Sequence, residues 1–188
     1  MGDRPWPERI ARVRFGPSTD ESLGAHLRSG RDTLRLVQPD SFVPVGFEPP
    51  TSLETEQFRL EPLGPQHNEA DLTAWTSSIE HIRSTAGYPD GNWPPLTGMT
   101  PEENLCDLRR HADDFTQRTG FTFTVIDPRD SGVIGCVYLY PSASAEWDVT
   151  VQSWVRPDRS ELDAPLSDAI ASWLASDWPW ERMDRCGR

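Results

Sequence analysis

Residues suited to binding an anion lie near the C-terminal end of the sequence. The stretch VRPDRSELDAPLSDAIASWL, from Val155 to Leu174, is typical of a strand end, a tight loop and a helix. Free backbone N–H groups at a helix N-terminus bind phosphates and other anions. This loop, however, has no glycine and carries three acids, Asp158, Glu161 and Asp163. The residues alone leave two interpretations, an anion site or only a capped helix.

Two capping patterns compete for the start of this helix. Ser160 and Asp163 form a capping-box pattern, which would begin the helix at Glu161. Pro165 would then lie inside the helix, where its ring clashes with the preceding turn. With Asp163 as the N-cap, Pro165 falls in the first turn and is tolerated. We therefore expect the helix to begin near Asp163.

Composition excludes several classes of function. All 18 basic residues are Arg, so no lysine can form a Schiff base or bind phosphate in a P-loop. A net charge of -12 disfavours nucleic acid as a partner. No apolar run approaches the ~20 residues of a membrane span. We expect a soluble cytoplasmic protein with no membrane partner.

The cysteines and histidines show no metal-binding pattern. The three cysteines are widely spaced, and we expect Cys106 and Cys136 to be packing residues. The spacing of His67, His81 and His111 does not suggest a metal site either. We therefore expect no metal.

The 188 residues are enough for one domain with a substantial core. Residues 1–50 are formally neutral, so the whole net charge lies in 51–188. Two β-like runs at 11–15 and 33–37 suggest a hairpin, and PDSFVPVGFEPP resembles a linker. We expect an N-terminal extension over 1–55 and a domain over 56–188.

Hydrophobic periodicity predicts the elements of the domain. Thr100, Pro101 and Glu103 form a capping box that starts the second helix, and Gly120 ends it. The predicted strands are 58–63, 121–127, 132–141, 147–155 and a short last strand, and the helices are 67–83, 100–120 and one ending near Ser176. This order, β-α-α-β-β-β-α-β, predicts an α/β fold with a mixed, mostly antiparallel sheet and helices on both faces.

This element order, with a strand ending in Val155-x-Pro157, resembles the GNAT superfamily of N-acetyltransferases. The resemblance covers about residues 56–188 and is that of a diverged member with a short C-terminal half. It implies acetyl-CoA as co-substrate, bound where two strands diverge, with its pyrophosphate on the loop before a helix.

The family's pyrophosphate loop reads Arg/Gln-x-x-Gly-x-Gly/Ala. Arg159 and Ala164 match its first and last positions, whereas Leu162 stands where glycine is expected. A side chain there limits the approach of backbone to phosphate. The cofactor-binding residues that the resemblance implies are Val155, Arg159, Ser160, Leu162 and Ala164.

The family's catalytic groups are only partly matched. Members often deprotonate the amine with a Glu on the strand, or through water, and protonate the thiolate with a Tyr on a later helix. Here Thr150 occupies the Glu position, and Asp148, two residues away on the same face, is the candidate base. The alternative is that Asp148 is a solvated strand-end acid. The sequence offers no counterpart of the later Tyr.

The acceptor pocket implied by the resemblance involves aromatic residues. Tyr88 and Trp93 belong to the loop 87–95, and Tyr138 lies on the middle strand of the predicted sheet. We expect these three to contact the substrate, and the alternative is that they only pack.

The resulting hypothesis is transfer of an acyl group from acyl-CoA to the amine of a small molecule by direct attack. The alternative is a GNAT-shaped protein that has lost CoA and serves as a binding or scaffold module, or that catalyses another small-molecule reaction. The short C-terminal half leaves one sheet edge open, which the N-terminal hairpin or a second chain in a homodimer would cover.

Overall fold

The computed structural model describes residues 41–88 and 93–185. The predicted runs at 11–15 and 33–37 lie outside these residues, as do Cys186 and part of the loop 87–95.

Six strands form one sheet in the order β1 to β6. Neighbouring strands are antiparallel except β5 and β6, which are parallel, so the sheet is mixed as predicted. The strands are β1 (Leu53–Glu54), β2 (Arg59–Pro62), β3 (Phe121–Ile126), β4 (Val133–Pro141), β5 (Val149–Val155) and β6 (Met183–Asp184).

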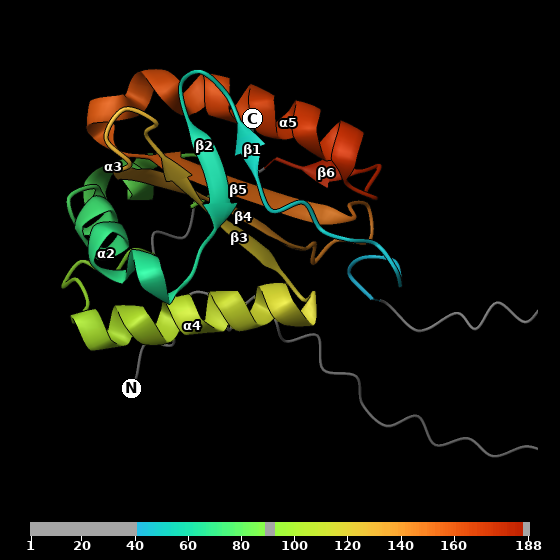
Figure 1. Ribbon diagram of the computed structural model, residues 1–188, viewed down its shortest axis with the longest axis horizontal. Coiled ribbons are helices and arrows are strands. Elements are labelled where there is room, and N and C mark those ends of the chain that lie inside the picture. Colours follow the sequence, from blue (N-terminus) through green and yellow to red (C-terminus); the bar gives the residue numbers. More distant parts are fainter. Residues whose placement is uncertain (1–40, 89–92, 186–188) are drawn as a thin grey trace, which may run out of the picture.

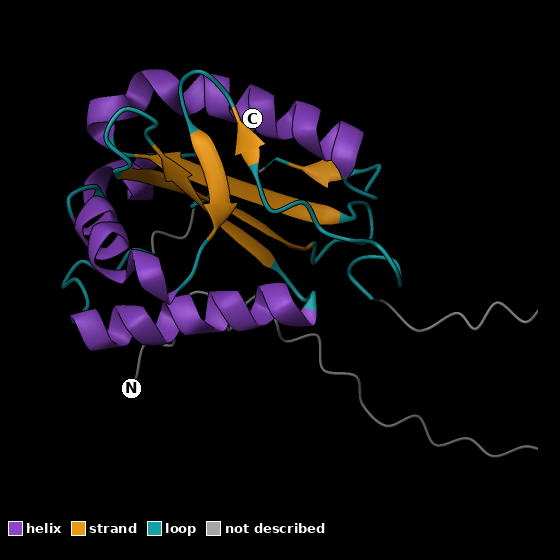
Figure 2. Cartoon of the chain, in the orientation of Figure 1, coloured by secondary structure: helices purple, strands orange, loops and turns teal. Residues whose placement is uncertain are grey.

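Helices cover both faces of this sheet (Figure 1, Figure 2). The α-helix α5 lies on one face, and α2 and α4 lie on the other. The helical elements are η1 (Pro65–His67), α2 (Asn68–Thr76), α3 (Ile79–Ser84), α4 (Pro101–Gln117), η2 (Pro157–Leu162) and α5 (Asp163–Asp177), where η marks a 3-10 helix. No helix among residues 41–88 and 93–185 is both long and apolar enough to cross a bilayer.

The predicted helix over 67–83 is wrong as a single element, because the chain breaks it into α2 and α3. The hydroxyls of Ser77 and Ser78 both donate to the carbonyl of Ala74, at 2.9 and 2.7 Å. Such local bonds compete with the helical backbone pattern. The capping box of α4 is confirmed, since the Thr100 hydroxyl accepts from the Glu103 N–H and the Glu103 carboxylate accepts from the Thr100 N–H.

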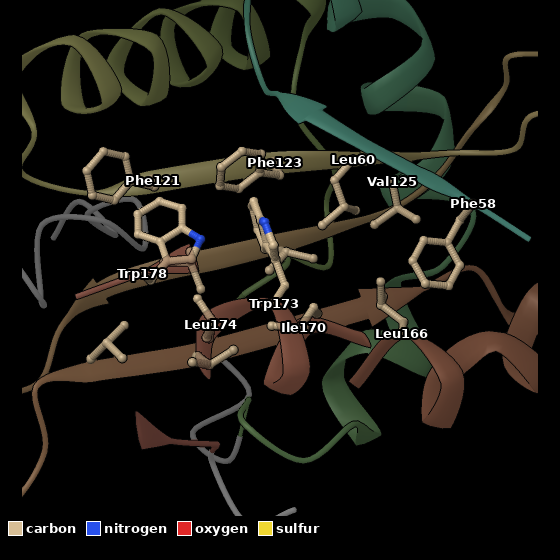
Figure 3. Close-up of a cluster of buried hydrophobic side chains, with 14 of the residues drawn as sticks. Phe58, Leu60, Phe121, Phe123, Val125, Leu166, Ile170, Trp173, Leu174 and Trp178 are labelled. Carbon is tan, nitrogen blue, oxygen red and sulfur yellow. The ribbon is translucent and has the colours of Figure 1, made fainter. Parts of the chain in front are cut away.

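The main core lies between the sheet and α5 (Figure 3). Phe121 and Phe123 of β3 pack edge-on against Trp178 and Trp173, with ring centroids 4.9 and 5.2 Å apart. Burial of such large side chains is the main source of stability.

The part of the predicted linker that is described, 41–50, also packs on this core. Val43 is 1% exposed, and Phe42 stacks on Trp180 with ring centroids 4.5 Å apart. The Trp180 indole N–H donates to the Phe42 carbonyl at 2.9 Å. A solvated linker does not account for these contacts.

Gly135 lies in the middle of β4, beside a register shift between β3 and β4. A β-carbon there would lie 2.1 Å from the Trp154 carbonyl oxygen, which is backbone and cannot move aside. We therefore expect Gly135→Ala to lower the free energy of unfolding by about 3 kcal/mol, measured by urea denaturation.

Gly64→Ala is the matched control. Its β-carbon would meet only the side-chain amide of the exposed Gln66, which can rotate away. We expect a change below about 1 kcal/mol there. Equal losses in the two variants would contradict this account of β4.

Candidate functional site

The strands β5 and β6 pair in parallel over only two residues. Val149 pairs with Met183 and Thr150 pairs with Asp184, and within the described residues no other pair joins the two strands. A small cavity at this edge, of about 10 Å³, is lined by Ala86, by 151–153 of β5, by Ser167 and Ile170 of α5, and by Arg185. Within the part of the chain that the structure describes, no strand pairs with β5 beyond Thr150 on this side, so its backbone groups there could bind a ligand.

The loop after α3 closes over this edge. The Gln152 side-chain amide donates to the Gly87 carbonyl, which fixes the loop to β5. Tyr88 is buried and packs on Trp93, with ring centroids 5.8 Å apart.

The predicted pyrophosphate loop forms the 3-10 helix η2 in front of α5. The α-helix begins at Asp163, as predicted. In η2 the Arg159 N–H donates to the Arg156 carbonyl and the Asp163 N–H donates to the Ser160 carbonyl. These N–H groups are used within the turn and are not directed at an anion.

Leu162 occupies the core and does not face a phosphate. It is 6% exposed, its φ is -86°, and it belongs to the cluster between the sheet and α5. The residue at the family's glycine position therefore needs no left-handed backbone here. Val155 is buried in the same cluster, whereas Ser160 and Ala164 are exposed.

The guanidinium of Arg159 contacts acids of its own chain. Its Nε and Nη2 lie 3.4 and 3.3 Å from Asp127 Oδ2, and its Nη1 donates to the Asp158 carbonyl. Arg129 also binds Asp127, and its hydrogen bonds hold the pKa of that carboxyl well below its usual range. Arg159 is thus already paired.

Asp148 fastens the segment before β6 to the start of β5. Its carboxylate accepts from the N–H groups of Glu181 and Arg182, at 3.1 and 2.9 Å, and lies 2.5 Å from the Arg182 guanidinium. The hydrogen bond from Arg182 lowers the pKa of Asp148, which weakens it as a base. Thr150 lies where β5 and β6 still pair, opposite Tyr140 of β4.

A second, larger cavity lies between α2, α4 and the sheet and measures about 40 Å³. It brings together Trp93 and Tyr138, two of the three predicted substrate residues, with ring centroids 6.1 Å apart. Its apolar walls are Leu63, Trp75, Trp93, Met99, Leu108 and Tyr138. Its polar groups are Asp71, Asn104, Asp107, His111 and Tyr140.

Asp71 of α2 is a buried carboxyl in this cavity, with 4% of its surface exposed. Asn104 Nδ2 donates to its Oδ2 at 3.1 Å, and the Cys136 thiol lies 3.6 Å from its Oδ1. Asn104 Oδ1 in turn accepts from the Trp75 indole N–H at 2.9 Å. Burial raises the pKa of Asp71 to about 6.

His111 of α4 faces the same cavity and is held by a chain of hydrogen bonds. The Tyr140 hydroxyl donates to Asp114 Oδ2 at 3.0 Å, so its oxygen accepts from His111 Nδ1 at 2.9 Å. Thr122 Oγ1 lies 3.0 Å from the same nitrogen. This network places the proton on Nδ1 and leaves Nε2 as an acceptor. Burial lowers the pKa of His111 to about 4, so the ring is neutral at pH 7.

Comparison with known proteins identifies the fold. No family model matches the sequence, and no curated protein is significantly similar to it. A probable acetyltransferase of known structure superposes with a TM-score of 0.56 at 9% identity, covering 70% of this chain and 71% of that chain. A putative ribosomal-protein-serine acetyltransferase from Vibrio cholerae gives 0.54 at 10% identity, covering 70% and 71%. A GCN5-related N-acetyltransferase from Brucella melitensis gives 0.51 at 19% identity, covering 72% and 59%.

The chain has the GNAT acetyltransferase fold. The GNAT resemblance read from the Val155-x-Pro157 strand end is confirmed at the level of fold. Within this fold, the predicted residues Val155 and Leu162 are buried in the core beside α5, and Arg159 is paired with Asp127.

Two functional candidates were missed in the sequence. Asp71 lies four residues before Trp75, a spacing that places both on the same face of α2 and was a usable signal. The partners of His111, Thr122 and Tyr140, come from two different strands, 11 and 29 residues further along the chain, which no local pattern shows. Cys136 is buried as expected, but Cys106 is exposed, so its predicted packing role is wrong.

Replacement of Asp71 should reveal the energetic cost of its buried charge. Burial raises the pKa of Asp71 from its ordinary 3.8 to about 6 in the folded protein. The free energy of unfolding therefore falls as the pH rises from about 3.8 to about 6, because the unfolded chain releases this proton more readily. We expect Asp71→Asn to gain about 3 kcal/mol relative to the wild type between pH 4 and pH 7.5, measured by urea denaturation at both pH values.

The control is Glu69→Gln, an exposed position on the same helix with the same change of charge. Its stability difference from the wild type should change little with pH. A pH-independent difference for Asp71→Asn would show that Asp71 has an ordinary pKa.

Proposed function

We propose that the protein is an acyl-CoA-dependent N-acyltransferase that acts on the amine of a small molecule by direct attack. The observation that carries this proposal is the edge of β5 that no described strand pairs with beyond Thr150, beside the cavity lined by 151–153 and Ser167. Unpaired backbone groups of β5 suit the amides of a pantetheine arm, and an N–H there is a candidate donor to the oxyanion. Acyl-CoA would supply the activated thioester.

The residues of the loop suit the CoA pyrophosphate less well. The N–H groups of η2 are used within the turn, Arg159 is paired with Asp127, and Asp158 and Glu161 add negative charge. We therefore propose that binding depends mainly on the pantetheine arm at the β5 edge, which reduces the part played by Arg159, Ser160 and Ala164.

Asp148 is better suited to a positioning role than to the role of base. Its bonds to Glu181 and Arg182 set where β6 leaves β5, and its lowered pKa disfavours proton uptake. We propose that Asp148, and Thr150 two residues further along, hold β6 against the start of β5.

The segment after α3, which covers the edge of β5, favours a small acceptor over a large one. Gln152 ties the loop after α3 to β5, and Tyr88 packs on Trp93 above Trp154, which restricts access for a folded protein substrate. A homodimer and a cytoplasmic location remain predictions from the sequence.

A second candidate function is a GNAT-shaped binding protein that no longer binds CoA. It is favoured by the closed 3-10 turn of η2 and by Leu162 in the core. Both functions share the fold, so CoA binding separates them.

Isothermal titration calorimetry with acetyl-CoA tests the proposal. We expect binding in the micromolar range, about -8 kcal/mol, and we expect Ser167→Phe to abolish it because a ring would fill the cavity between β5 and α5.

Ser172→Phe is the matched control, an exposed serine on the same helix outside this cavity. It should bind acetyl-CoA like the wild type. Absence of heat with wild-type protein at high concentration would contradict the transferase and favour the CoA-free binding protein.

A further inference from the structure

The cavity between α2, α4 and the sheet is separate from the smaller cavity at the edge of β5, because the two share no lining residue. We propose that this cavity binds a small organic cation, whose ammonium group meets Asp71 and whose carbon atoms pack against aromatic rings. The proposal does not rest on acyl transfer, and it holds whether or not the protein binds CoA.

The carboxylate of Asp71 has no cation in direct contact among the described residues, although the charge of His67 favours its ionised form. Among residues 41–88 and 93–185, no Arg or His forms an ion pair with it, and Asn104 and Cys136, which contact it, are neutral. Buried carboxylates are normally paired with a cation. Each carboxylate oxygen accepts more than one hydrogen bond, so Asp71 retains capacity for an ammonium donor.

Aromatic side chains line the same cavity as this carboxylate. Trp93 lies at the centre, with its ring centroid 6.1 Å from that of Trp75 and 6.1 Å from that of Tyr138. Tyr138 in turn lies 5.8 Å from the His111 ring. Aromatic faces attract ammonium groups and exclude water from them, as in aromatic cages for organic cations.

The polar groups of the cavity are mostly hydrogen-bond acceptors. His111 presents Nε2 as an acceptor, because Nδ1 is bonded to Tyr140 and Thr122. Asp107 is a second acid, but Arg110 pairs with it at 2.9 Å. The charge that remains to be balanced is that of Asp71, so the cavity selects a donor that carries positive charge and rejects an anion.

The size of the cavity limits the ligand. A volume of about 40 Å³ holds roughly three water molecules. The fitting chemistry is therefore an ammonium group on a short apolar chain, or the ammonium end of a longer molecule that extends out of the cavity past Trp93.

The test uses n-butylammonium and n-butanol, which are similar in length and differ in charge. Both are titrated into the full chain, and binding is followed by two-dimensional NMR of the indole N–H of Trp75, which donates to Asn104 beside Asp71. We expect saturable millimolar binding of n-butylammonium and at least about tenfold weaker binding of n-butanol.

Two variants locate the site. Asp71→Asn should weaken n-butylammonium binding at least about tenfold and leave n-butanol binding little changed. Glu69→Gln, the exposed control on the same helix, should bind both probes like the wild type. A thermal melt of each variant confirms that it is folded.

Equal affinity for the two probes, or an unchanged affinity of folded Asp71→Asn for n-butylammonium, would overturn the proposal. Acetyl-CoA titrations of the same variants keep the two sites distinguishable. If Asp71→Asn loses n-butylammonium binding and binds acetyl-CoA as the wild type does, the cation site is separate from the CoA site.

Discussion

The buried carboxyl of Asp71 is the constraint around which the α2–α4 side of the protein is organised. Asn104 of α4 links this carboxyl to the Trp75 indole, and Cys136 brings β4 into the same cluster. The bonds orient the two helices on the sheet and leave a cavity between them. Because burying a charge is costly, such an arrangement persists where it serves a purpose beyond packing.

The strand β5 contributes side chains to both faces of the sheet. Val151 and Val155 face the core against α5, whereas Trp154 faces Trp93 and the α2–α4 side. On its other edge, the same strand pairs with β6 at Val149 and Thr150, and with no described residue beyond them. The strand β5 lines the smaller cavity through 151–153 and contacts the wall of the larger one through the packing of Trp154 on Trp93.

The sequence predicted the architecture from local signals, whereas the side-chain contacts at the two cavities depend on residues far apart in the chain. Capping at Thr100 and the strand runs are local signals, and they held. The pairing of Asp148 with Arg182 and the network of His111 depend on residues 34 and 29 positions apart, which no local pattern shows. The burial of Leu162 in the core depends on packing against α5 and the sheet, which its position in a loop motif does not show.

The most direct measurement of the central claim is the ionisation of Asp71 itself. Its side-chain carboxyl carbon can be followed by NMR from pH 3 to pH 8 in protein labelled with ¹³C, and assigned with Asp71→Asn. We expect the Asp71 titration to have a midpoint near 6. This midpoint should fall when n-butylammonium is present, because the cation favours the carboxylate. A midpoint near the ordinary 3.8, unchanged by the cation, would contradict this expectation.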